Sequence, residues 1–336
     1  LEAEWTLPRR ARRGLGKSVS PGGGVLDPSR TLEGDEARTQ LDEEQRQTTP
    51  RRDLAKNEGF EEMSPEVGEL NIESTEHMLT TDTDIALSTL SAMASATDER
   101  LRALAQQLAA RVIVDLAATT PSHSRGVGRM RSMPMSDAGG DIDIDGSTEA
   151  LLMATAANHP PNVDDLRMHA WTRPDAALAI LIDRSGSMTG DRLAIAAVAA
   201  AAAAQRTKTD YCVIAFSDKA IVIKGIGQAR PVEDVINDVL RLRGFGPTDL
   251  SLAFRTAQSQ LARSNASRQR TIILSDCRPT EGGPPERQAA ALEQLAILAP
   301  ADDCEDAEAF AATVGAKWAK LAGPSDVPAA FALIAD

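Results

Sequence analysis

Aromatic residues are scarce in this chain of 336 residues: they make up 3% of it, with one Tyr and three Trp. A hydrophobic core must therefore be built from Ala, Leu, Ile and Val, and few rings are available on which single-stranded nucleic acid could stack. The formal net charge of −13 adds repulsion from phosphate backbones. We expect no nucleic-acid partner.

Cysteine and long hydrophobic runs are also lacking. The three cysteines, Cys212, Cys277 and Cys304, are widely spaced and form no C-x-x-C pair, so neither a disulfide scaffold nor a zinc site is indicated. No run of about 18 apolar residues occurs, which predicts no membrane insertion. The arginines near the N-terminus are not followed by the apolar segment of a signal peptide. We expect a cytoplasmic protein.

The first part of the chain, residues 1–75, has few aliphatic side chains and no sustained hydrophobic period. Glu, Asp, Arg, Gly and Pro dominate it, and such a composition buries too little apolar surface to offset the entropy lost on ordering. The prediction for 1–75 is a largely disordered segment, or one that a partner orders.

A helical and irregular region is predicted for 76–165. Apolar residues recur at steps of three and four between 101 and 116, which predicts an amphipathic helix, and an earlier helix is expected around 85–93. Residues 121–148 are rich in Gly, Ser, Pro and Asp, which favours irregular structure.

Apolar runs alternate with helical stretches over 166–336. This pattern indicates a doubly wound α/β domain, with a mostly parallel sheet flanked by helices on both faces. The expected strands are 177–182, 211–216, 220–225, 271–275, 295–299 and 316–322. The expected helices are 191–206, 231–242, 249–263, 285–294, 305–314 and 327–335. The Ala-rich stretch 194–204 is apolar on all sides, so we expect it to pack closely against the sheet.

The stretch ILIDRSGSMTG, residues 180–190, places polar residues directly after an apolar run. Ligands of parallel sheets bind outside the carboxyl ends of the strands, and Asp183 falls at such an end. The Lys of a phosphate-binding loop is missing here. Ser185 has neither the G-x-S-x-G setting nor a later histidine for acyl transfer. Asp183, Ser185 and Ser187 alternate, so their oxygens can point the same way, and oxygen ligands select Mg²⁺, Mn²⁺ or Ca²⁺.

Two further segments are predicted to end at the same edge of the sheet: GPTDLS, which contains Thr248, and IILSDCRPT, which contains Asp276. D-x-S-x-S followed by this Thr and this Asp resembles the von Willebrand factor A family and its metal-ion-dependent adhesion site. The resemblance covers about 175–336. It implies that the hydroxyls contact the ion directly and that the aspartates bind directly or through water. The metal-contacting residues that it implies are Asp183, Ser185, Ser187, Thr248 and Asp276.

Such a site is suited to binding a partner. Neutral hydroxyls cancel little of the ion's charge, so an open coordination position attracts a carboxylate, which an Asp or Glu of a protein partner would supply. The resemblance extends to intracellular magnesium-chelatase-like subunits and to the CoxE-like proteins that accompany MoxR-type AAA+ ATPases. It implies a non-catalytic adaptor of such an ATPase rather than an enzyme. The sequence contains no Walker motif, so the ATPase would be a separate chain.

Two alternative functions remain: a stand-alone cytoplasmic binding module that works without an ATPase, and a hydrolase that uses Ser185 or the metal. The stretch around Ser185 also fits a plain strand-to-helix turn with capping serines. These alternatives make different use of the same residues, so the sequence leaves them open.

A second acidic stretch, GGDIDIDGSTEA at 139–150, has aspartates spaced as in a calcium-binding loop. Leu152 stands where that loop requires a bidentate Glu, which argues against calcium binding. The favoured interpretation is an exposed strand whose Ile142 and Ile144 face inward and whose aspartates face solvent.

Overall fold

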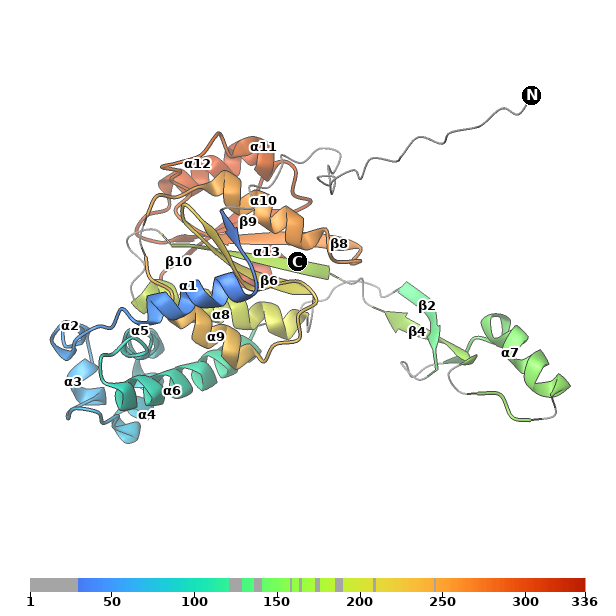
Figure 1. Cartoon of the computed structure of the whole chain (residues 1–336), viewed down its shortest axis with the longest axis horizontal. Helices are drawn as coiled ribbons and strands as arrows, with labels where there is room; N and C mark the ends of the chain where they lie inside the picture. Colours follow the sequence, from blue (N-terminus) through green and yellow to red (C-terminus); the bar gives the residue numbers. More distant parts are fainter. Residues whose placement is uncertain are drawn as a thin grey trace, which may run out of the picture.

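The computed structural model of the chain describes residues 30–120, 129–135, 141–157, 159–162, 165–172, 176–184, 190–207, 210–244 and 246–335. In this part of the chain a seven-stranded sheet has the order β1-β7-β6-β5-β8-β9-β10 (Figure 1). All neighbouring strands are parallel except β6 and β7. The strands are β1 (Thr31–Leu32), β5 (Ala176–Asp183), β6 (Tyr211–Phe216), β7 (Ala220–Lys224), β8 (Arg268–Leu274), β9 (Leu295–Pro300) and β10 (Lys317–Leu321). The predicted doubly wound, mostly parallel α/β fold is confirmed.

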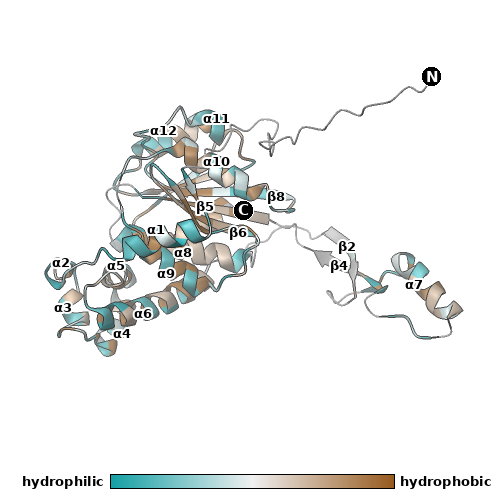
Figure 2. Ribbon diagram, viewed as in Figure 1, coloured by the Kyte–Doolittle hydropathy of each residue, from teal (hydrophilic) through white to brown (hydrophobic). Residues whose placement is uncertain are grey.

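Helices cover both faces of this sheet (Figure 1). On one face lie α10 (Leu250–Leu261), α11 (Glu286–Ala289) and α12 (Glu305–Val314). On the other lie α8 (Gly190–Arg206), α9 (Val232–Leu240) and α13 (Val327–Ala335). Figure 2 shows hydrophobic residues gathered in the central strands and hydrophilic ones on peripheral helices such as α2 and α11. Among the described helices, none combines the length and the hydrophobicity needed to cross a membrane.

One predicted helix is much shorter than expected. The helical pattern at 285–294 forms a helix only over Glu286–Ala289. The reason lies in the neighbouring strand: the backbone N–H of Thr271 donates to the carbonyl of Gln294 at 2.8 Å, so the chain at Gln294 already belongs to the sheet edge. Few residues remain between α11 and β9 for further helical turns.

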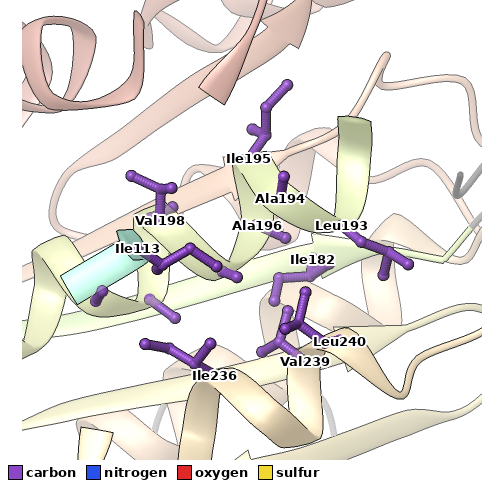
Figure 3. Close-up of a cluster of buried hydrophobic side chains, with 14 of the residues drawn as sticks. Ile113, Ile182, Leu193, Ala194, Ile195, Ala196, Val198, Ile236, Val239 and Leu240 are labelled. Carbon is purple, nitrogen blue, oxygen red and sulfur yellow. The ribbon is translucent and has the colours of Figure 1, made fainter. Parts of the chain in front are cut away.

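A second layer of helices covers α8. Helices α5 (Thr83–Met93) and α6 (Glu99–Ala118) pack on its outer side, so α8 lies between them and the sheet. Every residue from 193 to 203 is buried, and Figure 3 shows Ile113 of α6 and Ile182 of β5 near α8. The small alanine side chains permit close approach on both sides, which explains why this helix is apolar all round.

Residues 30–75 differ from the predicted disordered or partner-ordered segment, because they form defined elements on the chain's own core. After β1 come α1 (Asp35–Gln45), α2 (Arg51–Leu54), α3 (Phe60–Met63) and α4 (Ile72–Thr81). Their few apolar side chains are concentrated at buried positions, which average composition does not reveal: Ala37, Leu41, Leu54, Phe60 and Met63 all join the core that contains α8. Residues 1–29 lie outside the described residues, and for them the prediction remains untested.

A small antiparallel unit precedes the main sheet strand β5 in the chain. It has the strand order β2-β4-β3 and one helix. Its elements are β2 (Arg129–Pro134), β3 (Asp141–Ile142), α7 (Ile144–Ala156) and β4 (Arg167–Thr172).

This unit corrects the interpretation of 139–150 as an exposed strand. Strand β3 is two residues long, and Asp143 then caps α7 by accepting a hydrogen bond from the Gly146 N–H at 2.9 Å. An aspartate at this position favours a helix start, and the Ala, Leu and Met that follow favour a helix. Ile142 and Ile144 are 54% and 68% exposed and do not face inward, and Asp143 is buried, whereas Asp141 and Asp145 are exposed as predicted.

Lys224, on β7, is a fully buried cation. Its ammonium group donates to the carbonyl oxygens of Tyr211 at 2.8 Å and of Gly225 at 3.2 Å, and it lies 3.9 Å from the centre of the Tyr211 ring. Burial lowers the pKa of Lys224 from 10.5 to about 8.

The lowered pKa of Lys224 predicts a stability that rises with pH. Between about pH 8 and 10.5 the unfolded lysine still holds a proton that the buried one has lost, so unfolding takes up a proton. The free energy of unfolding, measured relative to Lys224→Met, should rise by up to about 3 kcal/mol across this window. Urea denaturation at several pH values measures it, with the exposed Lys219→Met as control. A difference that does not change with pH would contradict the prediction.

Candidate metal site

Three of the five predicted metal-contacting residues lie within the described residues: two at the carboxyl ends of strands, and one just before a helix. Asp183 is the last residue of β5. Thr248 directly precedes Asp249, the residue that caps α10, and Asp276 follows the end of β8. The other two predicted residues, Ser185 and Ser187, lie outside the described residues.

The carboxylate of Asp183 is contacted by two hydroxyl groups. Asp183 is 5% exposed; its Oδ2 accepts a hydrogen bond from Ser275 Oγ at 2.5 Å, and its Oδ1 accepts one from Thr248 Oγ1 at 3.5 Å. The structure thus brings Asp183 and Thr248 together across 65 residues of chain.

Ser275 was missed by the sequence analysis. Its Oγ accepts a hydrogen bond from the Cys277 N–H at 2.9 Å, so the hydroxyl proton is directed to Asp183. Ser275 therefore orients the Asp183 carboxylate. The signal that could have found it is its position beside Asp276, at the end of the same apolar strand.

Asp276 shares a cavity with Asp183. Both line a cavity of about 40 Å³ at the carboxyl ends of β5, β8 and β9, which is room for a water-sized group. Asp276 Oδ1 also accepts a hydrogen bond from the Arg278 N–H at 3.1 Å. The structure thus places Asp276 in the same cavity as Asp183.

The pKa of Cys277 reflects its burial and the negative charges of the site carboxylates. Burial, together with the negative charges of Asp183 and Asp276, raises the pKa of its thiol to about 12. The thiol therefore stays protonated, and Cys277 is no candidate nucleophile. Its backbone has φ of 60°, a left-handed conformation that is uncommon outside glycine and that turns the chain directly after Asp276.

The loop around Thr248 is held by backbone hydrogen bonds. The Thr248 N–H donates to Thr280 Oγ1 at 2.8 Å, and its carbonyl accepts from the N–H groups of Thr280 and Glu281 at 3.0 and 3.2 Å. Gly282 follows with φ of +88°, and any side chain there would collide with the carboxylate of Asp249. Glycine is thus required for the close approach of this loop to Asp249.

Comparison with known families identifies this part of the chain. Residues 178–278 match the family model of the von Willebrand factor type A domain, a range that contains all five predicted metal-contacting residues. This part of the chain has a fold like that of a von Willebrand factor type A domain, and we refer to it as the type A domain. The narrower likeness to magnesium-chelatase-like and CoxE-like proteins remains a prediction.

Several solved structures are similar to the type A domain. The manganese-loaded TRAP protein of Plasmodium vivax aligns at 14% identity over 46% of this chain and 71% of that one, with a TM-score of 0.38. An aerotolerance-related membrane protein of Bacteroides fragilis aligns at 13% identity over 47% and 96%, with a TM-score of 0.36. Proximal thread matrix protein 1 of the mussel byssus, with a zinc-occupied MIDAS motif, aligns at 13% identity over 48% and 47%, with a TM-score of 0.39. This chain thus spans less than half of the mussel protein. Comparison with curated proteins gave no match.

The described oxygens of the type A domain fit a divalent ion. The 3.5 Å between Asp183 Oδ1 and Thr248 Oγ1 is longer than the usual O–H···O hydrogen bond. Two adjacent ligands on an ion with metal–oxygen distances of about 2.4 Å are about 3.4 Å apart, so both oxygens can face one ion. Among the described residues, no group of three or more His, Cys, Asp or Glu could hold a metal by itself. An ion bound at these described residues would therefore need hydroxyl ligands as well.

Proposed function

We propose that this chain binds a protein partner through a divalent cation held by its type A domain. The observation that carries the proposal is the Asp183 carboxylate, which is buried at the end of β5 with the Thr248 hydroxyl against one of its oxygens. The family match over 178–278 supports it. The proposed contacting residues are Asp183, Ser185, Ser187, Thr248 and Asp276.

Each described residue has a distinct part in this proposal. Asp183 and Asp276 supply negative charge beside the ion, Thr248 supplies a neutral hydroxyl, and Ser275 orients Asp183. When bound, the ion supplies a positive centre with an open coordination position, which an Asp or Glu of the partner fills. The oxygen ligands favour Mg²⁺, Mn²⁺ or Ca²⁺. The chain acts as a binding module and not as an enzyme.

The test is a calorimetric titration of the intact chain with each of these three cations, together with thermal unfolding. We expect at least one cation to bind and to raise the melting temperature, because a ligand that binds only the folded state stabilises it. Asp302→Ala, which removes an exposed carboxylate, should leave the affinity unchanged. If none of the three cations binds, the proposed function is wrong.

Thr248→Ala is expected to weaken binding of an acidic partner more than binding of the metal. The threonine hydroxyl contributes no charge, so its loss leaves most of the ion's attraction to the aspartates. The substitution does change the coordination of the ion at the position where the partner binds. Titration with metal alone, and then with a partner or an acidic peptide, separates the two affinities. Thr248→Ser keeps the hydroxyl and should behave as wild type. Equal losses of metal affinity and of partner affinity would contradict this prediction.

A more specific proposal concerns the identity of the protein partner. We propose a MoxR-type AAA+ ATPase in the cytoplasm, for which the chain would be a non-catalytic adaptor; this rests on the resemblance of the motif alone. Affinity purification from native cytosol should recover such an ATPase in Mg²⁺, but neither in EDTA nor with Asp183→Ala. Recovery of the same proteins in all three conditions would show that partner binding does not need the metal. It would favour the alternatives, a metal-independent binding module or a hydrolase.

A further inference from the structure

The segment formed by β1 and α1, residues 30–45, touches loops on both sides of the candidate metal site. We call this segment the N-terminal brace. Strand β1 extends the sheet beyond β7, and α1 contributes Ala37 and Leu41 to the main core. Two charged side chains of the brace, Arg30 and Glu44, reach the loops that carry the site residues.

Arg30 joins three chain segments around Thr248. Its Nε donates to the carbonyl of Asp218 at 2.8 Å, and its Nη1 lies 3.0 Å from Asp249 Oδ2. Its Nη2 lies 3.9 Å from Glu281 Oε1. Asp249 follows Thr248 directly, and the Glu281 N–H donates to the Thr248 carbonyl at 3.2 Å. One guanidinium group thus contacts the residues that flank and hold Thr248.

Glu44 acts in the same way on the Asp183 side. Glu44 Oε1 accepts a hydrogen bond from Arg184 Nη2 at 2.7 Å, and Glu44 Oε2 accepts one from the Arg243 N–H at 3.0 Å. Arg184 follows Asp183 directly and is 1% exposed, and Glu44 is 2% exposed. The carboxylate of Glu44 therefore ties the side chain of Arg184, the residue after Asp183, to the backbone of the segment that leads to Thr248.

We propose that Arg30 and Glu44 are positioning residues of the metal site, so that the N-terminal brace is a working part of it. This inference rests on the proposed function. The site residues come from separate segments, and an ion binds well only when their oxygens are held at fixed spacing. Residues that orient metal ligands typically change metal affinity by about 10- to 100-fold when they are replaced.

The chemistry of the contacts favours positioning over simple stabilisation. An apolar pair of similar volume in place of Glu44 and Arg184 would often stabilise the fold equally well, because burying two charges carries a large desolvation cost. A carboxylate that accepts hydrogen bonds from a guanidinium and a backbone N–H fixes the relative orientation of both groups, because charge-assisted hydrogen bonds have narrow geometry.

The brace contains its own matched control. Glu33 pairs with Arg263 at 3.0 Å and accepts a hydrogen bond from Gln260 Nε2 at 2.7 Å. Both partners lie at the C-terminal end of α10, whereas Thr248 lies just before its start. Glu33→Gln therefore loosens the brace without touching the site loops.

The experiment measures Mn²⁺ affinity by calorimetry for the intact wild-type chain and for Arg30→Ala, Glu44→Gln and Glu33→Gln. We expect Arg30→Ala and Glu44→Gln to lose about tenfold or more in affinity, while Glu33→Gln stays within about twofold. Arg30 is partly exposed, and Glu44→Gln keeps the side-chain shape and an oxygen that accepts hydrogen bonds. Because Glu44→Gln removes a buried charge, the titrations are run at a temperature where urea denaturation shows every variant to be folded. In metal-free protein, amide hydrogen exchange around 184 and 248 should quicken in Arg30→Ala and Glu44→Gln alone.

Three outcomes would overturn the proposal. Equal Mn²⁺ affinity in all four proteins would reject the positioning role and leave the proposed function standing. Equal losses in all three variants would show a general effect of the brace on stability instead. If the wild-type chain binds no Mn²⁺, Mg²⁺ or Ca²⁺, the proposed function fails, and the positioning role fails with it.

Discussion

Asp183→Ala is expected to abolish divalent-metal binding and to leave the fold nearly intact. The side chain lies at the rim of the sheet, at the end of β5, and supplies buried negative charge beside a second carboxylate, Asp276. The side chain belongs to neither hydrophobic core cluster, so its removal should leave the packing of the domain nearly intact. The affinity for the ion should fall by more than about 100-fold, beyond the range seen for residues that only orient ligands.

Calorimetry and thermal unfolding of the same samples measure both parts of this expectation. Asp183→Asn keeps the shape of the side chain and removes its charge, so it should lose affinity as well. Asp302→Ala, which removes an exposed carboxylate that is not among the five proposed metal-contacting residues, is the control for a general loss of negative charge. Unchanged affinity in Asp183→Ala would remove this residue from the site.

Glu44→Ala is expected to lower the free energy of unfolding by about 3–5 kcal/mol, the range found when one partner of a buried ion pair is removed. The side chains of Arg184 and Glu44 are 2% and 3% exposed, with 2.7 Å between their charged atoms. Burial lowers the pKa of Arg184, and the charge of Glu44 opposes that shift. Without Glu44, the buried guanidinium loses this compensation. Since domains are stable by about 5–15 kcal/mol, the loss is a large share of the total.

Urea denaturation of Glu44→Ala measures this loss. Its neighbour Glu43 is exposed, so Glu43→Ala should change stability by less than about 0.5 kcal/mol. Replacing both Glu44 and Arg184 with Met removes the uncompensated charge and should restore part of the stability. A loss in Glu44→Ala no larger than in Glu43→Ala would show that the pair contributes nothing to folding.

The α/β part of the fold could be predicted because its signals are local. Each apolar run forms one strand, and α12 and α13 begin and end close to the predicted residues. The pattern failed at α11, where hydrogen bonding along the sheet edge at Gln294 overrides helical periodicity. It failed again at Asp143, where a capping hydrogen bond starts a helix in a stretch whose alternation suggested a strand.

The site was predictable to the same degree. Asp183 and Thr248 could be grouped because parallel strands of one sheet end at one edge, and the structure places their oxygens 3.5 Å apart. Ser275, which has no place in the D-x-S-x-S pattern, emerged only when its hydroxyl was seen against the Asp183 carboxylate. The assignment of these residues as metal ligands remains a prediction.

For residues 166–336, the sequence by itself determined the order of strands and helices and the polar residues at the strand ends, because periodicity and strand termini depend on near neighbours in the chain. Only the tertiary structure decided which distant residues hold those polar groups in place. Glu44 meets Arg184 across 140 residues and the Arg243 N–H across 199. No local pattern marks Glu44, because its role arises only when the sheet and the N-terminal brace fold against each other and exclude water from the pair.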